Sequence, residues 1–100
     1  MRIEKSSRPA KKYMVRLDGK TVHFGAAGYE DFTTHGDENR KKRYLARHKN
    51  EEWGRDGVHT AGFWARWILW NKPTIQQSVQ DINKTVQTAR SNKLKHIVAP

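Results

Sequence analysis

The chain has 100 residues, of which 35% are hydrophobic and 30% charged, and it carries a net charge of +10 without a cysteine. This length suits one domain with a small core, and the lack of cysteine excludes disulfide bonds and thiolate metal sites. No apolar run is long enough to span a membrane and no secretion signal is recognisable, so we expect an intracellular protein. The charge predicts an anionic partner.

The N-terminal segment, residues 1–11, is basic, polar and interrupted by Pro9. This composition predicts an extended arm that has no regular structure unless something holds it. We therefore divide the chain into this basic arm, a small α+β domain over 12–86 and a basic tail over 87–100. In this interpretation the two extensions reach onto neighbouring molecules.

A β-hairpin is predicted for residues 12–25. Two segments in which apolar and polar residues alternate flank Asp18-Gly19, a pair that tolerates the positive φ angles of a type I′ turn. Because an isolated hairpin is only marginally stable in water, its apolar face must pack on helices. That face consists of Tyr13, Val15, Leu17, Val22 and Phe24.

A basic helix is predicted for residues 37–50, after a glycine-containing loop that Tyr29 and Phe32 anchor to the core. From 40 to 50 there are six lysines or arginines and no acid, whereas a solvated helix face would carry paired Glu and Lys. We therefore predict contact with phosphates or with an acidic protein surface. The predicted anion-binding residues are Arg40, Lys41, Lys42, Arg43, Arg47 and Lys49.

An aromatic helix is predicted for "TAGFWARWILW", residues 60–70, with Thr60 as its N-cap. The i, i+4, i+7 spacing predicts that Phe63, Trp67 and Trp70 lie in the core. One hairpin cannot also cover the adjacent strip, so we predict that Trp64 and Ile68 dock on a partner. Base stacking by this helix is the weaker alternative, because cations hardly interleave with its rings.

The last predicted helix begins at Thr74, which forms a capping box with Gln77. Its apolar side chains are Ile75, Val79, Ile82 and Val86. The predicted fold is therefore α+β, with an N-terminal hairpin packed on about three helices and with basic extensions at both ends.

Nothing in the sequence predicts catalysis. The five histidines lack metal-ligand spacing, the acids stand in loops and at helix starts, and no glycine-rich phosphate loop follows a strand. We predict no catalytic residue, no metal or other cofactor, and no small-molecule substrate.

Three segments in a fixed order, "KKYMVRLDGKTVHFG", "YEDFTTHGDENRKKRYLARH" and "TAGFWARWILWNKPTIQQSVQDIN", resemble a family of small basic proteins of nucleocytoplasmic large DNA viruses. The resemblance covers about residues 11–83. It implies a viral origin and a place in the virion, either in the capsid lattice or with the packaged genome. It implies no enzymatic activity and no catalytic residue.

Our first hypothesis is a non-enzymatic structural protein of the particle, of the minor capsid or cement type. Its partners would be capsid or other virion proteins, bridged by the basic extensions and the aromatic helix. The alternative is a non-specific nucleic-acid-binding protein associated with the genome, which contacts DNA or RNA through the basic helix. A basic ribosomal-type protein is a third hypothesis. Salt-dependent binding to duplex DNA separates the second from the first.

Overall fold

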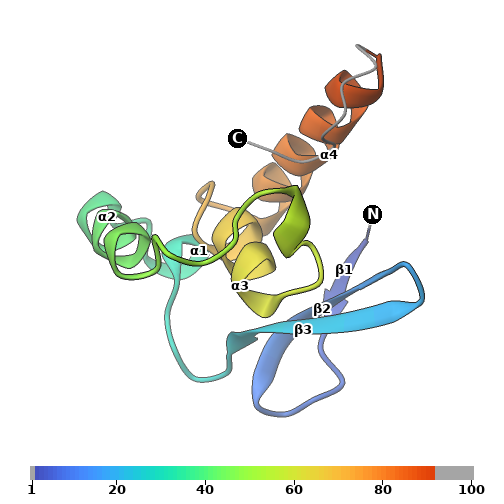
Figure 1. Ribbon diagram of the computed structural model, residues 1–100. Coiled ribbons are helices and arrows are strands. Elements are labelled where there is room, and N and C mark those ends of the chain that lie inside the picture. Colours follow the sequence, from blue (N-terminus) through green and yellow to red (C-terminus); the bar gives the residue numbers. More distant parts are fainter. Residues whose placement is uncertain (1, 92–100) are drawn as a thin grey trace.

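The computed structural model describes the backbone of residues 2–91 and the side chains of residues 2–84. An antiparallel sheet is followed by helices, which confirms the predicted α+β class (Figure 1). The strands are β1 (Ile3–Lys5), β2 (Lys11–Leu17) and β3 (Lys20–Ala26). The helices are α1 (Phe32–His35), α2 (Glu38–Arg47), the 3₁₀ turn η1 (Arg55–Gly57), α3 (Ala61–Trp64), the π-helical turn η2 (Ala65–Leu69) and α4 (Ile75–Ser91).

The predicted hairpin is confirmed in its register and its turn. Leu17 pairs with Lys20, and the two turn residues have positive φ angles, 51° at Asp18 and 73° at Gly19. Both angles belong to a type I′ turn, whose twist matches that of the flanking strands. Val15 and Phe24 are fully buried on the face that meets the helices.

The N-terminal segment differs from the predicted arm. Residues 3–5 form β1, which pairs antiparallel with β2 and places Ile3 opposite Val15. The free edge of β2 presents unpaired backbone amides and carbonyls, and β1 satisfies them. This part of the predicted arm is therefore a strand of the domain. The sequence did not indicate this strand, because Ile3 is its one apolar residue and no alternating pattern can be recognised.

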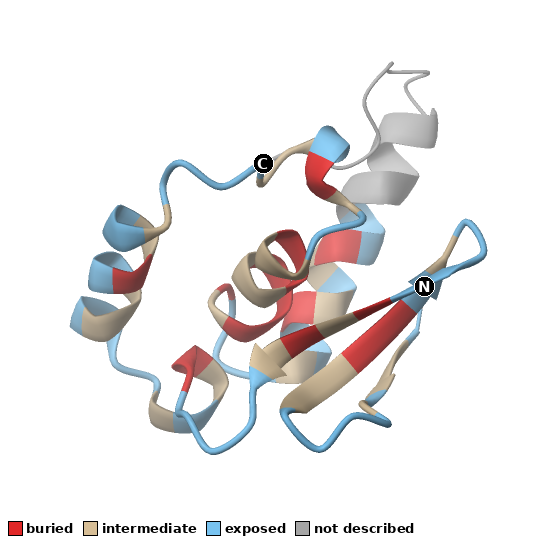
Figure 2. Ribbon diagram, turned by 60° about the horizontal axis from the view of Figure 1, so that its bottom comes forward, coloured by how far each residue is buried: buried red, intermediate tan, exposed pale blue. Residues whose placement is uncertain are grey.

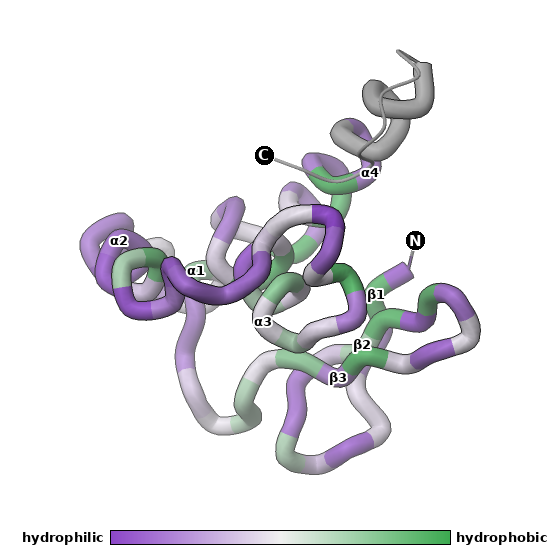
Figure 3. The backbone as a smooth tube through the Cα atoms, viewed as in Figure 1, coloured by the Kyte–Doolittle hydropathy of each residue, from purple (hydrophilic) through white to green (hydrophobic). Residues whose placement is uncertain are grey.

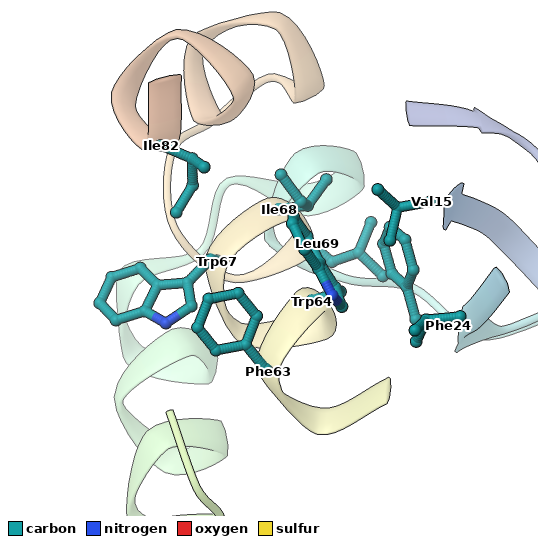
Figure 4. Packing of buried hydrophobic residues seen from close by; sticks show 9 residues of the cluster. Val15, Phe24, Phe63, Trp64, Trp67, Ile68, Leu69 and Ile82 are labelled. Carbon is teal, nitrogen blue, oxygen red and sulfur yellow. The ribbon is translucent and has the colours of Figure 1, made fainter. Parts of the chain in front are cut away.

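The core lies between the sheet and α4, with α3 and η2 in the middle (Figure 4). The buried residues gather where these elements face one another (Figure 2). Thr60 caps α3: its Oγ1 accepts from the amide of Phe63 at 3.3 Å, which confirms the predicted N-cap. The amide of Trp70 donates to the carbonyl of Ala65, which gives the helix its π turn.

The predicted docking strip is wrong. Trp64 is 3% exposed and Ile68 is fully buried, and the indole Nε1 of Trp64 donates to the Val58 carbonyl at 2.7 Å. The physical reason is that α3 and η2 are covered from two directions, by β3 on one side and by α4 on the other. Neither residue is available to a partner.

α4 packs on the core through Ile75, Val79 and Ile82. One half of its predicted capping box is present, because the Gln77 amide donates to Thr74 Oγ1 at 3.1 Å, while the Gln77 side chain accepts from the Thr74 hydroxyl. The backbone is helical to Ser91, so the first residues of the predicted tail continue α4. The rest of the tail and the side chain of Val86 lie outside the described part of the chain. Among the described residues, no helix combines the length and apolarity needed to cross a membrane.

Candidate nucleic-acid interface

α2 lies at the periphery of the molecule, beside α1 (Figure 1). Asp37 is the N-cap of α2: its carboxylate accepts from the amides of Asn39 and Arg40, at 2.9 and 3.2 Å. The hydrogen bond from the Arg40 amide holds the pKa of Asp37 below its usual range. Gly36, with a φ of 63°, ends α1 and turns the chain into this cap. The boundaries of α2 are therefore fixed by local sequence.

Tyr44 is the buried residue of α2. The Tyr44 ring lies between Trp70, with centroids 4.3 Å apart and planes 3° apart, and His48, also at 4.3 Å. Burial raises the pKa of Tyr44 to about 12. Because this single ring carries most of the packing, most of α2 faces solvent. The helix is mainly hydrophilic, in contrast to α3 (Figure 3).

Two of the six predicted anion-binding residues are already engaged within the protein. Lys41 Nζ donates to the carbonyl of Asn71 at 2.8 Å and lies 5.0 Å above the Phe32 ring, and burial lowers its pKa. Lys41 is therefore a structural residue, which corrects its predicted role. Arg40 forms an ion pair with Glu30 at 3.1 Å.

The other four predicted residues are exposed, and none forms an ion pair with another described residue. Three of them belong to α2, and the fourth follows it in the turn after residue 48. We call this set the basic face. It consists of Lys42, Arg43, Arg47 and Lys49.

Two hollows adjoin the arginine side of α2. The first, of about 320 Å³, is lined by Arg40, Arg43 and Arg47 together with Tyr29, Glu30 and Trp70. The second, of about 400 Å³, shares Tyr29, Glu30, Arg47 and Trp70 with the first and reaches the apolar side chains of Ala65 and Leu69. We call the two hollows together the α2 cleft. Three of the predicted anion-binding residues, Arg40, Arg43 and Arg47, thus line one side of a concave site.

Two of the three carboxylates that line the α2 cleft pair with cations, and the third contacts a histidine. Asp31, which caps α1, accepts from Lys12 Nζ at 2.6 Å, Glu30 pairs with Arg40, and Glu51 contacts His48. Arg43 and Arg47 have no such partner among the described residues. The cleft therefore has an excess of positive charge at these two arginines.

Tyr29 was expected to anchor the loop to the core, and this is wrong. Phe32 occupies that position and is 2% exposed, whereas Tyr29 is 74% exposed. The amide of Tyr29 donates to the Ala26 carbonyl, so the residue lies in the turn after β3. No periodicity governs a residue in such a turn, and the sequence offered no signal for its exposure.

A comparison with protein families gives a match to part of the chain. The profile of a family of unknown function (DUF5754) matches residues 1–48, a range that contains the sheet, α1 and α2. Tyr29 and most of the basic face lie within this range, whereas Ala65, Leu69 and Trp70 of the α2 cleft lie outside it. No curated protein and no solved structure matches the chain.

Proposed function

We propose that this protein is a non-enzymatic nucleic-acid-binding protein that contacts the phosphate backbone through the basic face. The observation that carries the proposal is the set of four exposed cations, none of which forms an ion pair with a described carboxylate. Arg43 and Arg47 are one helical turn apart, where like charges repel each other. A bound polyanion would remove this repulsion, and guanidinium groups suit phosphate oxygens because they donate bidentate hydrogen bonds.

The chemistry of these side chains supports binding without sequence specificity. Contacts to phosphates position a protein on nucleic acid but carry no information about the bases. Their free energy comes largely from released counterions, so affinity falls linearly with the logarithm of salt concentration. We propose that the protein binds DNA of any sequence in this way.

The biological setting of the proposal rests on the resemblance to small basic proteins of large DNA viruses. Combined with the basic face, it supports a protein of the virion that is associated with the packaged genome inside the infected cell. The match to a family of unknown function neither adds to this setting nor speaks against it.

A minor capsid or cement role has less support from the described residues. It was based on the family resemblance, on a docking strip, now found in the core, and on two basic extensions, of which the N-terminal one contains β1. A bridging role then depends on residues 92–100, outside the described part. Locating the protein in purified particles, in the shell or with the genome, tests this alternative directly.

The experiment that tests nucleic-acid binding compares two variants of equal net charge. Arg43→Gln with Arg47→Gln removes two cations from the basic face, and Arg16→Gln with Lys20→Gln removes two exposed cations from the hairpin. Affinity for a random duplex of about 30 base pairs is measured by fluorescence anisotropy between about 50 and 400 mM salt.

We expect the first variant to bind at least about tenfold more weakly than the second at the same salt concentration, because only the first loses phosphate contacts. Both variants should keep the far-UV circular dichroism of the unmodified protein, since all four side chains are exposed. Equal loss in the two variants would mean that net charge alone attracts DNA. Unchanged affinity in the first would overturn the proposal.

A further inference from the structure

Tyr29 is the most exposed large hydrophobic side chain in the described part of the protein, at 74%. A single exposed aromatic ring is ordinary on a protein surface and indicates nothing by itself. The position of Tyr29 is informative, however, because it lines both hollows of the α2 cleft beside Arg47. The next residue, Glu30, forms an ion pair with Arg40, which links the loop that carries the ring to α2.

The other rings of the cleft are already occupied by one another. Tyr44 lies between Trp70 and His48, and the His35 ring approaches Trp70 to 5.4 Å. Tyr29, by contrast, stacks on no other ring in the described part of the chain. It therefore offers a planar face that a flat ligand can cover.

We infer that the α2 cleft binds an unpaired strand of nucleic acid, with one base stacked on Tyr29 and the neighbouring phosphates held by Arg43 and Arg47. The inference rests on the proposed function and names its substrate class. Grooves for single strands combine cations that follow the backbone with aromatic rings on which bases stack. The α2 cleft brings both groups together within one concave site.

The dimensions and chemistry of the cleft favour an unpaired base over a duplex. Its larger hollow, of about 400 Å³, falls within the roughly 300–1,000 Å³ of small-molecule sites and has an apolar floor at Ala65 and Leu69. In a duplex each base is covered by its neighbours, and reaching it costs the energy of unstacking. A duplex can thus use the basic face but leaves Tyr29 without a partner.

The test uses three proteins and two oligonucleotides. The proteins are the unmodified chain, Tyr29→Ala, which removes the ring, and Tyr29→Phe, which keeps it. The oligonucleotides are a single-stranded thymidine oligomer and a strand of the same length and charge in which the central nucleotides are abasic. Affinities are measured by fluorescence anisotropy at one salt concentration.

We expect Tyr29→Ala to weaken binding to the thymidine oligomer by about 5- to 150-fold, the range that corresponds to one stacked base. Tyr29→Phe should bind nearly as tightly as the unmodified protein. The abasic strand should bind weakly to all three proteins and to the same extent. Melting temperatures should agree among the three proteins, because the side chain is exposed.

Failure of this inference can be told from failure of the proposed function. If Tyr29→Ala leaves the affinity for the thymidine oligomer unchanged, or weakens both strands equally, the stacking role is overturned. The loss of duplex binding on changing Arg43 and Arg47 would still support the basic face. If that pair of changes affects neither duplex nor single strand, the proposed function fails and the inference fails with it.

Discussion

At the scale of single residues, Trp67 joins the aromatic helix to the loop before it. Its indole Nε1 donates to the Trp53 carbonyl at 2.8 Å, the guanidinium of Arg66 lies 4.0 Å from its ring, and it is 6% exposed. Trp67→Ala should lower the free energy of unfolding by about 3–5 kcal/mol, because it leaves a large cavity. Urea denaturation measures this loss, and an unchanged midpoint would show that the ring is not part of the core.

Gly25 sits where β3 approaches η2. Its φ is 79°, and a Cβ atom there would lie 2.7 Å from Leu69 Cδ1. Gly28 is a matched control, because its φ is 88° but an added Cβ would meet nothing within 4 Å. Both alanine variants should lose stability from backbone strain, by about 1 kcal/mol, and Gly25→Ala should lose clearly more. Equal melting temperatures for the two variants would contradict the close approach.

At the scale of elements, β1 contributes to the core although it is short. Ile3 packs against the core cluster, whereas Lys5 in the same strand is exposed. Ile3→Ala should lower the free energy of unfolding by about 1–3 kcal/mol, which is less than for a fully buried isoleucine because Ile3 is only partly buried. Lys5→Ala should lower it little. Chemical denaturation of the two variants side by side checks this. Identical stabilities would mean that the segment behaves as the free arm predicted from sequence.

The outer side of the sheet contains a histidine that makes stability depend on pH. His23 contacts Ser6 Oγ at 2.8 Å, and desolvation, followed by the charges of Arg8 and Lys11, lowers its pKa below 6.5. The folded state therefore favours neutral His23. The contribution of His23 to stability is fully present when the pH is above the pKa of His23 in the unfolded chain. It is lost as the pH falls through the lower pKa of the folded state.

Acidification from about pH 7.5 to about pH 5 should accordingly reduce the urea midpoint. His23→Gln should reduce this pH dependence, because glutamine keeps a polar side chain but does not titrate. Comparing both proteins at both pH values separates His23 from the other histidines. An equally steep loss of stability in the variant would assign the effect to another group.

At the scale of the whole molecule, in the proposed function, the net charge of +10 attracts nucleic acid from a distance, whereas the basic face makes the direct contacts with phosphates. Four phosphate contacts predict that the logarithm of the binding constant falls with the logarithm of salt concentration with a slope between about −3 and −4. Arg43→Gln with Arg47→Gln should make this slope shallower by about 2. Affinity measured over a series of salt concentrations gives the slope directly, and an unchanged slope would mean that these arginines touch no phosphate.

The sequence by itself determined the features that depend on near neighbours. The hairpin followed from alternation around Asp18-Gly19, the starts of two helices from Thr60 and Thr74, and the exposed cations of α2 from an uncompensated run of basic residues. Each of these depends on backbone angles or hydrogen bonds within a few residues, so a local pattern is enough to predict it.

Only the tertiary structure decided which surfaces remain free. Trp64 and Ile68 are buried because β3, distant in sequence, and α4, the next helix along the chain, cover opposite sides of α3 and η2. Lys41 is engaged by the carbonyl of Asn71, and of the two rings expected to anchor the loop, Phe32 is buried and Tyr29 is exposed. Periodicity gives the direction of a side chain, but burial depends on what packs over it, and that is settled by contacts between segments far apart in the chain.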